Sequence, residues 1–180
     1  MTACVKKITL ILGGARSGKS TYAQQLAATM GGKVLFCATA EPLDDEMQSR
    51  IEQHRRSRPV DWDTVEASRD IGTALHKMVA GYDTVIIDCI TLLVANCIGE
   101  NTNVDTAEQL VHSEITNLIN LMQRKHSSYM LVSNELGNGL VPENGLGRVY
   151  RDVLGKANQM LAAHADEVYL MVAGLPLKLK

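Results

Sequence analysis

Aromatic residues are scarce in this chain: one Phe, one Trp and five Tyr make up 4% of its 180 residues. We therefore expect a core built on Leu, Ile, Val, Ala and Met, within a hydrophobic share of 46%. Basic residues are not in excess, because the formal net charge is −2, and this argues against nucleic acid as a general partner. No apolar run approaches the ~20 residues of a membrane-spanning helix, so we expect no membrane insertion.

The four cysteines lack the spacing of a metal site. Cys4, Cys37, Cys89 and Cys97 form no C-x-x-C pair, and no histidine stands at zinc-finger spacing from them. Small buried thiols in a reducing compartment are favoured over a zinc site or disulfides. No signal peptide opens the sequence. We therefore expect a cytoplasmic protein.

Strand-like and helix-like segments alternate along the chain. A length of 180 residues suits a single domain, 1–180, and no repeat or linker divides it. The expected strands cover 7–12, 33–38, 62–66, 83–88, 128–133 and 167–173, and the expected helices cover 19–30, 43–57, 69–80, 104–126 and 146–165. Segments 98–103 and 134–147 are predicted loops. This alternation predicts an α/β fold with a mainly parallel central sheet and helices on both faces.

A glycine-rich segment between the first strand and the first helix fits the P-loop pattern G-x-x-x-x-G-K-[ST]. It reads Gly13, Gly14, Ala15, Arg16, Ser17, Gly18, Lys19, Ser20. Backbone N–H groups of such a loop and the following helix N-terminus bind phosphates. Lys19 would reach the β- and γ-phosphates, and Ser20 would ligate Mg²⁺. The alternative, a chance glycine-rich turn, does not explain this strand–loop–helix context, so we predict a P-loop NTPase-like fold that binds a nucleoside triphosphate.

Asp88 closes the apolar run Val85-Ile86-Ile87 and is the candidate second metal ligand. P-loop proteins place an acidic group at the end of a neighbouring strand to hold Mg²⁺. The alternative is that Asp88 caps the helix that follows it.

His54 lies on a predicted helix whose positions 47, 51, 54 and 58 share one face. Arginines surround it at positions 50, 55, 56 and 58, and guanidinium groups suit phosphate oxygens. His54 could therefore attack an α-phosphate and form a phosphoramidate. Taken alone, the residues favour a histidine that only packs or hydrogen-bonds beside a solvated arginine face.

Together these motifs resemble a known family, the bifunctional adenosylcobinamide kinase/adenosylcobinamide-phosphate guanylyltransferases of cobalamin biosynthesis. The resemblance combines the P-loop with D-D-E-M-x-x-R-I-x-x-H-x-x-x-R-P over residues 44–59 and N-E-x-G-x-G-x-V-P-E over residues 134–143. Shorter matches extend it nearly end to end: Ala38-Thr39-Ala40, Glu66, Asp88-Cys89-Ile90-Thr91, Arg151-Asp152, Asn158-Gln159 and Ala165-Asp166-Glu167-Val168.

The resemblance implies two reactions. The first transfers the γ-phosphate of ATP or GTP to the hydroxyl of the aminopropanol arm of adenosylcobinamide. The second transfers GMP from GTP to that phosphate through a histidine–GMP intermediate, here His54, and releases pyrophosphate. Guanine-nucleotide contacts are implied for Ala38, Thr39, Ala40, Arg55, Arg56, Ser57, Arg58, Glu66 and Asp88. A homotrimer with sites near subunit boundaries is also implied.

Several alternatives stay open at this stage. Glu135 or Glu143 could orient the acceptor alcohol, or both could brace the glycine-rich loop. Two other functions compete with the bifunctional transferase. One is a small-molecule kinase in which His54 is idle, and the other is a nucleotide-dependent switch that binds a protein partner.

Overall fold

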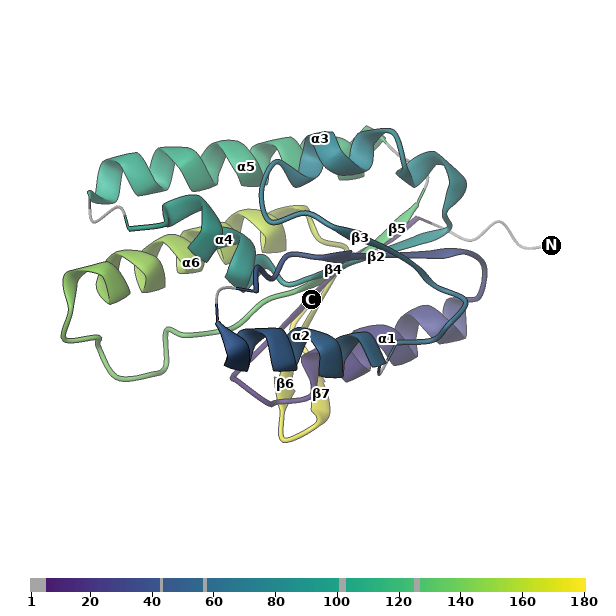
Figure 1. Cartoon of the computed structure of the whole chain (residues 1–180), viewed down its shortest axis with the longest axis horizontal. Helices are drawn as coiled ribbons and strands as arrows, with labels where there is room; N and C mark the ends of the chain where they lie inside the picture. The colour runs from purple at the N-terminus through teal and green to yellow at the C-terminus, as the bar shows by residue number, and fades with distance from the viewer. Residues whose placement is uncertain (1–5, 43, 57, 101–102, 125–126) are drawn as a thin grey trace.

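The computed structural model describes residues 6–42, 44–56, 58–100, 103–124 and 127–180, apart from the side chain of Arg50. Its seven strands form one sheet in the order β3-β2-β4-β5-β1-β6-β7 (Figure 1). The strands are β1 (Ile8–Gly13), β2 (Val34–Ala38), β3 (Asp63–Glu66), β4 (Thr84–Asp88), β5 (Ser128–Val132), β6 (Glu167–Val172) and β7 (Leu175–Lys178). Every neighbouring pair is parallel except β6 and β7.

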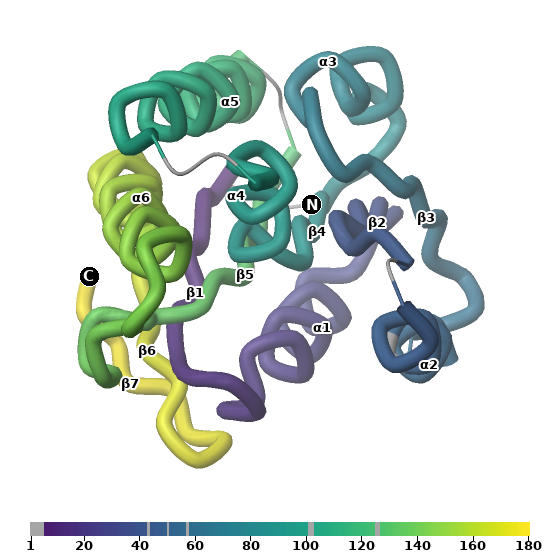
Figure 2. The backbone as a smooth tube through the Cα atoms, turned by 60° about the vertical axis from the view of Figure 1, so that its left-hand side comes forward, coloured from purple at the N-terminus to yellow at the C-terminus, as the bar shows by residue number. Residues whose placement is uncertain are grey.

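Helices cover both faces of the sheet, which confirms the predicted fold class (Figures 1 and 2). One face carries α3 (Ile71–His76), α4 (Ile90–Ile98), α5 (Val104–Arg124) and α6 (Gly145–His164), and the other carries α1 (Lys19–Met30) and α2 (Asp45–Arg56). A short 3₁₀ helix spans Val79–Gly81. None of the helices in the described ranges is both long and apolar enough to cross a bilayer.

The core is aliphatic, as the composition predicts. Alternate residues of the central strands supply two clusters, one beneath α3–α6 and one beneath α1. Tyr129 and Phe36 are the largest fully buried side chains, and the rest of the twelve largest are Leu and Ile. Ile86 and Val132 belong to the cluster beneath α1. Side chains alternate between the two faces of a strand, so Asp88 and Asn134, two positions further along, are directed toward the same side at the carboxyl edge of the sheet.

Two elements were missed by the sequence prediction. Helix α4 is a nine-residue run of mainly apolar residues, several of them β-branched, and it lacks the polar face by which an amphipathic helix is found. It is buried between the sheet and helices α5 and α6. Strand β7 is four exposed residues containing Pro176, which an edge strand accommodates. The helix expected at 69–80 is shorter in the structure: α3 ends at His76, and the 3₁₀ helix follows it.

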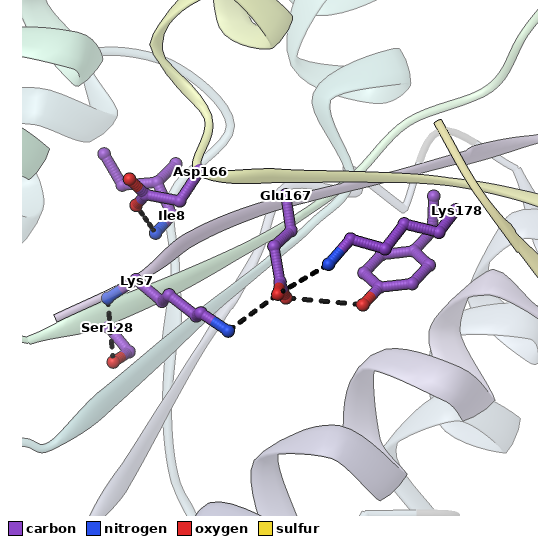
Figure 3. A network of polar contacts seen from close by, with 7 residues as sticks. Lys7, Ile8, Ser128, Asp166, Glu167 and Lys178 are labelled. Carbon is purple, nitrogen blue, oxygen red and sulfur yellow. Dashed lines mark hydrogen bonds and ion pairs between the residues drawn. The ribbon is translucent and has the colours of Figure 1, made fainter. Parts of the chain in front are cut away.

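Glu167 joins three segments at the amino end of the sheet (Figure 3). Its carboxylate accepts hydrogen bonds from Lys7 Nζ at 2.7 Å and from Lys178 Nζ at 3.0 Å. These bonds hold the pKa of Glu167 below its ordinary value. Next to it, Asp166 Oδ2 accepts from the Ile8 backbone N–H at 2.7 Å. The start of β1 is thereby tied to the last hairpin of the chain.

The described cysteines are free thiols. Cys37 is buried, and burial raises its pKa to about 12. Cys89 and Cys97 are half-buried, and burial raises the pKa of each to about 11. Cys4 lies outside the described residues. Cys37 is thus buried as expected, whereas Cys89 and Cys97 are only partly so.

Candidate active site

A cavity of about 590 Å³ lies at the carboxyl edge of the sheet, on its α1 side. Ligand sites of α/β sheets commonly occupy this edge, and the volume is in the range of small-molecule pockets. The ends of β2, β4 and β5 contribute Ala38, Asp88 and Val132. The P-loop and the start of α1 form one wall with residues 15–21, and α2 forms another.

Glycine is required at two positions of the P-loop. Gly13 has φ 151°, and a Cβ there would lie 2.7 Å from the Met171 carbonyl oxygen. Gly18 has φ 94° and would place a Cβ 3.2 Å from Gly174 Cα. Another residue would strain the backbone at both positions and displace the β6–β7 turn, which donates a hydrogen bond from Gly174 N to the Ser17 carbonyl at 3.0 Å. The loop is therefore fixed by the last hairpin.

Lys19 is held against its own loop. Its Nζ donates to the Gly14 carbonyl oxygen at 2.6 Å, and the residue is only 8% exposed. Burial lowers the pKa of Lys19, and the nearby Asp88 carboxylate opposes that shift. A buried ammonium group on a P-loop is suited to the phosphates of a nucleotide.

Asp88 lies opposite the P-loop at the end of β4. Its carboxylate lies beside the Ser20 hydroxyl. Burial raises the pKa of Asp88, while this hydroxyl and the charges of His54, Arg58 and Lys19 favour the carboxylate. The alternative role as a helix cap is wrong, because the N-cap of α4 is Cys89 and no side chain caps it.

The carboxylate of Asp88 and the hydroxyl of Ser20 fit a magnesium ion. Mg²⁺ prefers oxygen ligands and commonly takes one or two from protein, with water and substrate phosphates completing the shell. In the described part of the chain, no group of three or more His, Cys, Asp or Glu side chains could hold a metal. Any ion at Ser20 and Asp88 would therefore need oxygen ligands from a bound phosphate or water.

His54 lies in the last turn of α2 and lines the same cavity as the P-loop. Met47, Ile51 and Arg58 line it too, as the spacing predicts. No residue of α2 whose side chain is described is buried. The fold thereby brings a histidine and a phosphate-binding loop to the lining of one cavity.

Arg58 stacks on Phe36. Its guanidinium carbon lies 3.9 Å from the centre of the phenyl ring of β2. Burial lowers the pKa of Arg58, and among the described residues its Nε and Nη1 atoms are buried without a hydrogen-bond acceptor. A guanidinium group with orphaned donors in a cavity that contains Lys19 is suited to an anionic ligand.

The other basic residues near α2 differ in placement. Arg55 pairs with Glu66, and both line the cavity. Arg56 instead forms an i,i+4 pair with Glu52 at 3.7 Å and is exposed outside the cavity lining. Ser57 lies outside the described residues, as does the side chain of Arg50.

Thr39 is fully buried and does not line the cavity, although its neighbours Ala38 and Ala40 do. Its hydroxyl donates to the Cys89 carbonyl at 2.7 Å and accepts from the Cys89 N–H at 2.8 Å. Its own N–H donates to the Asp88 carbonyl at 3.2 Å. The side chain of Thr39 thus holds the backbone beside Asp88 and is not exposed to a nucleotide.

The two glutamates considered for the acceptor alcohol do not line the cavity. Glu135 Oε1 accepts from the Gly137 N–H at 2.7 Å, which braces the glycine-rich loop, and Glu143 is exposed. Sequence reasoning did not assign a role to other residues that do line it, among them Pro42, Gln48, Cys89, Thr91, Leu92 and Asn134. The sequence feature that could have predicted a cavity position for Asn134 is its place directly after a buried strand.

Comparisons with known proteins identify the family of this chain. The family model described as cobinamide kinase / cobinamide phosphate guanyltransferase matches residues 9–179. The bifunctional adenosylcobalamin biosynthesis protein CobU of Escherichia coli (strain K12) is 41% identical over 179 residues, covering 95% of this chain and 98% of that protein. The protein of the same name from Salmonella typhimurium is 42% identical, again over 95% of this chain and 98% of that protein. The bifunctional adenosylcobalamin biosynthesis protein CobP of Pseudomonas aeruginosa is 38% identical over 95% of this chain and 96% of that protein. The chain belongs to the cobinamide kinase / cobinamide phosphate guanyltransferase family, with a P-loop NTPase-like fold and kinase and nucleotidyltransferase activities in cobalamin biosynthesis.

Proposed function

We propose that this enzyme phosphorylates adenosylcobinamide with ATP or GTP and then transfers GMP to the product through a covalent guanylyl-His54. Both reactions would use the same cavity, the one at the carboxyl edge of the sheet. Family membership favours this function over a kinase with an idle histidine and over a nucleotide-dependent switch.

In the guanylyl step, a ring nitrogen of His54 attacks the α-phosphorus of GTP. The bond between that phosphorus and the α,β-bridging oxygen breaks, and its electron pair leaves with pyrophosphate. A phosphate oxygen of adenosylcobinamide phosphate then attacks the same phosphorus, and the P–N bond breaks. The products are adenosylcobinamide-GDP and regenerated His54. Covalent capture divides one difficult displacement into two easier ones.

The observation that carries the proposal is that His54 and the P-loop line the same cavity, with the orphaned donors of Arg58 beside them. In this arrangement the P-loop and Lys19 bind the leaving pyrophosphate, while Arg58 binds the α-phosphate. Arg55, held by Glu66, adds positive charge to the same wall. Such fixed charges stabilise a displacement at phosphorus without having to reorganise during it.

Ser20 and Asp88 would hold Mg²⁺, which would neutralise charge on the phosphates. Ala38 and Ala40 would contact the nucleotide directly, and Thr39 would contribute only through its backbone. Residues 1–180 would form one transferase domain, since all seven strands share one sheet. We also place the enzyme in the cytoplasm, where its nucleotides are available, and its free thiols fit that compartment.

A homotrimer is part of the proposal. The exposed apolar residues Val172, Leu175, Leu177 and Leu179 lie on β6, on β7 and just after it, at the edge of the sheet, where a second subunit would cover them. Light scattering after size exclusion would measure the mass, and a monomer at micromolar concentration would contradict this part.

The test of the covalent step is incubation with Mg²⁺ and GTP labelled on the α- or the γ-phosphate, followed by peptide mapping. We expect an acid-labile α-label on the peptide that contains His54. The His54→Ala variant should lose the α-label and still transfer the γ-phosphate to adenosylcobinamide. His76→Ala is the matched control, because His76 is exposed on α3 and does not line the cavity. Full guanylyl transfer by His54→Ala would contradict the mechanism.

A further inference from the structure

Asn134 lines the cavity between the P-loop and the end of β4 that carries Asp88. It lies two residues beyond the end of β5, and β5 is paired with the P-loop strand β1 on one side and with the Asp88 strand β4 on the other. The next residue, Glu135, donates its N–H to the Gly13 carbonyl oxygen at 3.0 Å. Asn134 is thus placed directly beside the first glycine of the P-loop.

The backbone of Asn134 is held on both sides. Its N–H donates to Thr91 Oγ1 at 2.7 Å, and its carbonyl accepts from Asn158 Nδ2 at 3.0 Å. Asn158 is buried and accepts in turn from the Ser133 hydroxyl at 2.7 Å. Tyr150 completes the network by donating to the Thr91 carbonyl at 3.1 Å.

Because both backbone groups are engaged, the side-chain amide is the polar group that Asn134 offers to the cavity it lines. A carboxamide supplies one acceptor and two donors and does not titrate. The network fixes the backbone from which this side chain extends. Neither Glu135 nor Glu143 reaches this cavity, so the glycine-rich segment presents an amide to it and no carboxylate.

We propose that Asn134 is a catalytic residue of the kinase step, an inference that rests on the proposed function. Its carboxamide oxygen accepts a hydrogen bond from the acceptor hydroxyl of adenosylcobinamide, and its amide N–H donates to an oxygen of the γ-phosphoryl group. Phosphoryl transfer proceeds through a loose transition state in which orientation and charge stabilisation matter more than a strong base. An uncharged amide is therefore sufficient, and it does not repel the phosphates as a carboxylate would.

In this step the hydroxyl oxygen forms a bond to the γ-phosphorus. The bond from that phosphorus to the β,γ-bridging oxygen breaks, and its electron pair leaves with the nucleoside diphosphate, whose phosphates Lys19 binds. The proton of the hydroxyl passes to an oxygen of the transferred phosphoryl group. Asn134 orients the reactants and takes no proton. The α-phosphorus is not involved, so the guanylylation of His54 does not need this amide.

The experiment measures both reactions in Asn134→Ala and Asn134→Asp. With γ-labelled ATP and adenosylcobinamide, we expect kcat of the alanine variant to fall ~100-fold, the usual effect of removing one preorganised donor. KM for the nucleotide and the rate of α-label capture on His54 from GTP should stay within ~3-fold of the wild type, since ground-state binding is kept. Asn134→Asp should be impaired at least as much, because its charge opposes the γ-phosphate.

The matched control is Asn138→Ala, which removes an exposed amide of the same segment. Glu135→Gln and Glu143→Gln should retain kinase activity. Equal losses of γ-transfer and α-capture in Asn134→Ala would indicate a structural or nucleotide-binding role and overturn the inference, as would unchanged γ-transfer. A wild-type enzyme that fails to phosphorylate adenosylcobinamide would contradict the proposed kinase reaction itself, and with it this role.

Discussion

The Ser20 hydroxyl lies beside the Asp88 carboxylate, and this places the first turn of α1 against the carboxyl end of β4. Two oxygen groups from distant parts of the sequence are thereby brought together beside Lys19. The phosphate-binding loop and the proposed metal ligand therefore form one unit.

Asp88→Asn tests this unit. Asparagine removes the negative charge with almost no change in the size of the side chain, so we expect the fold to be retained and both transferase rates to fall at least ~100-fold. Rates measured across a Mg²⁺ titration check this expectation, with a thermal melt as the folding control. Asp105→Asn, an exposed change at the start of α5, should have no effect. An Asp88→Asn enzyme with the wild-type Mg²⁺ dependence would exclude Asp88 as a metal ligand.

Arg58→Lys tests the guanidinium group that is stacked on Phe36. Lysine keeps the positive charge but loses the planar stacking and the forked donors, so the single-turnover rate of α-label capture from GTP should fall ~10-fold or more. Arg56→Lys is the matched control because Arg56 is exposed and pairs with Glu52. Equal rates in the two variants would indicate that only charge matters at Arg58.

Thr39→Val removes a buried hydroxyl that bonds both backbone groups of Cys89. We expect the free energy of unfolding to fall by about 2 kcal/mol, because the variant leaves a buried N–H without an acceptor. Thr39→Ser keeps the hydroxyl, and its free energy of unfolding should fall by about half as much or less, since only a methyl group is removed. Urea denaturation of the three proteins measures the difference, and a valine variant as stable as the wild type would show that the backbone rearranges at no cost.

Glu167→Gln should change how stability depends on pH. The hydrogen bonds from Lys7 and Lys178 lower the pKa of Glu167 in the folded state, so ionised Glu167 stabilises the fold above its ordinary pKa of 4.5. That contribution disappears as the pH falls through the lowered value. At neutral pH we expect a loss of at most about 1 kcal/mol, because the lysines are exposed.

Urea midpoints taken from pH 7 down to pH 3 would check this prediction. The wild type and the variant should converge at acid pH. Curves that stay parallel over the whole range would assign the loss to packing and not to ionisation.

Much of the fold was predictable because its apolar strands alternate with amphipathic helices. The helix α4 was missed since it is buried on several sides, and burial removes the periodicity that a sequence pattern can display. For the site, the P-loop pattern located one wall and the face shared by Met47, Ile51 and His54 located the other. The inward position of Asn134 and the burial of Thr39 depend on contacts between strands far apart in the chain, which local sequence does not specify.

The strand order determines when this enzyme can first bind a nucleotide during its synthesis. β1 is made first, yet it pairs with β5 and β6, which are among the last segments to be made. The P-loop that follows β1 is fixed in part by the β6–β7 turn, so it lacks this support until nearly the whole chain has left the ribosome. Contacts of such long sequence separation slow folding. A chain truncated before β6 would contain the residues that line the cavity but would lack the turn that holds its P-loop.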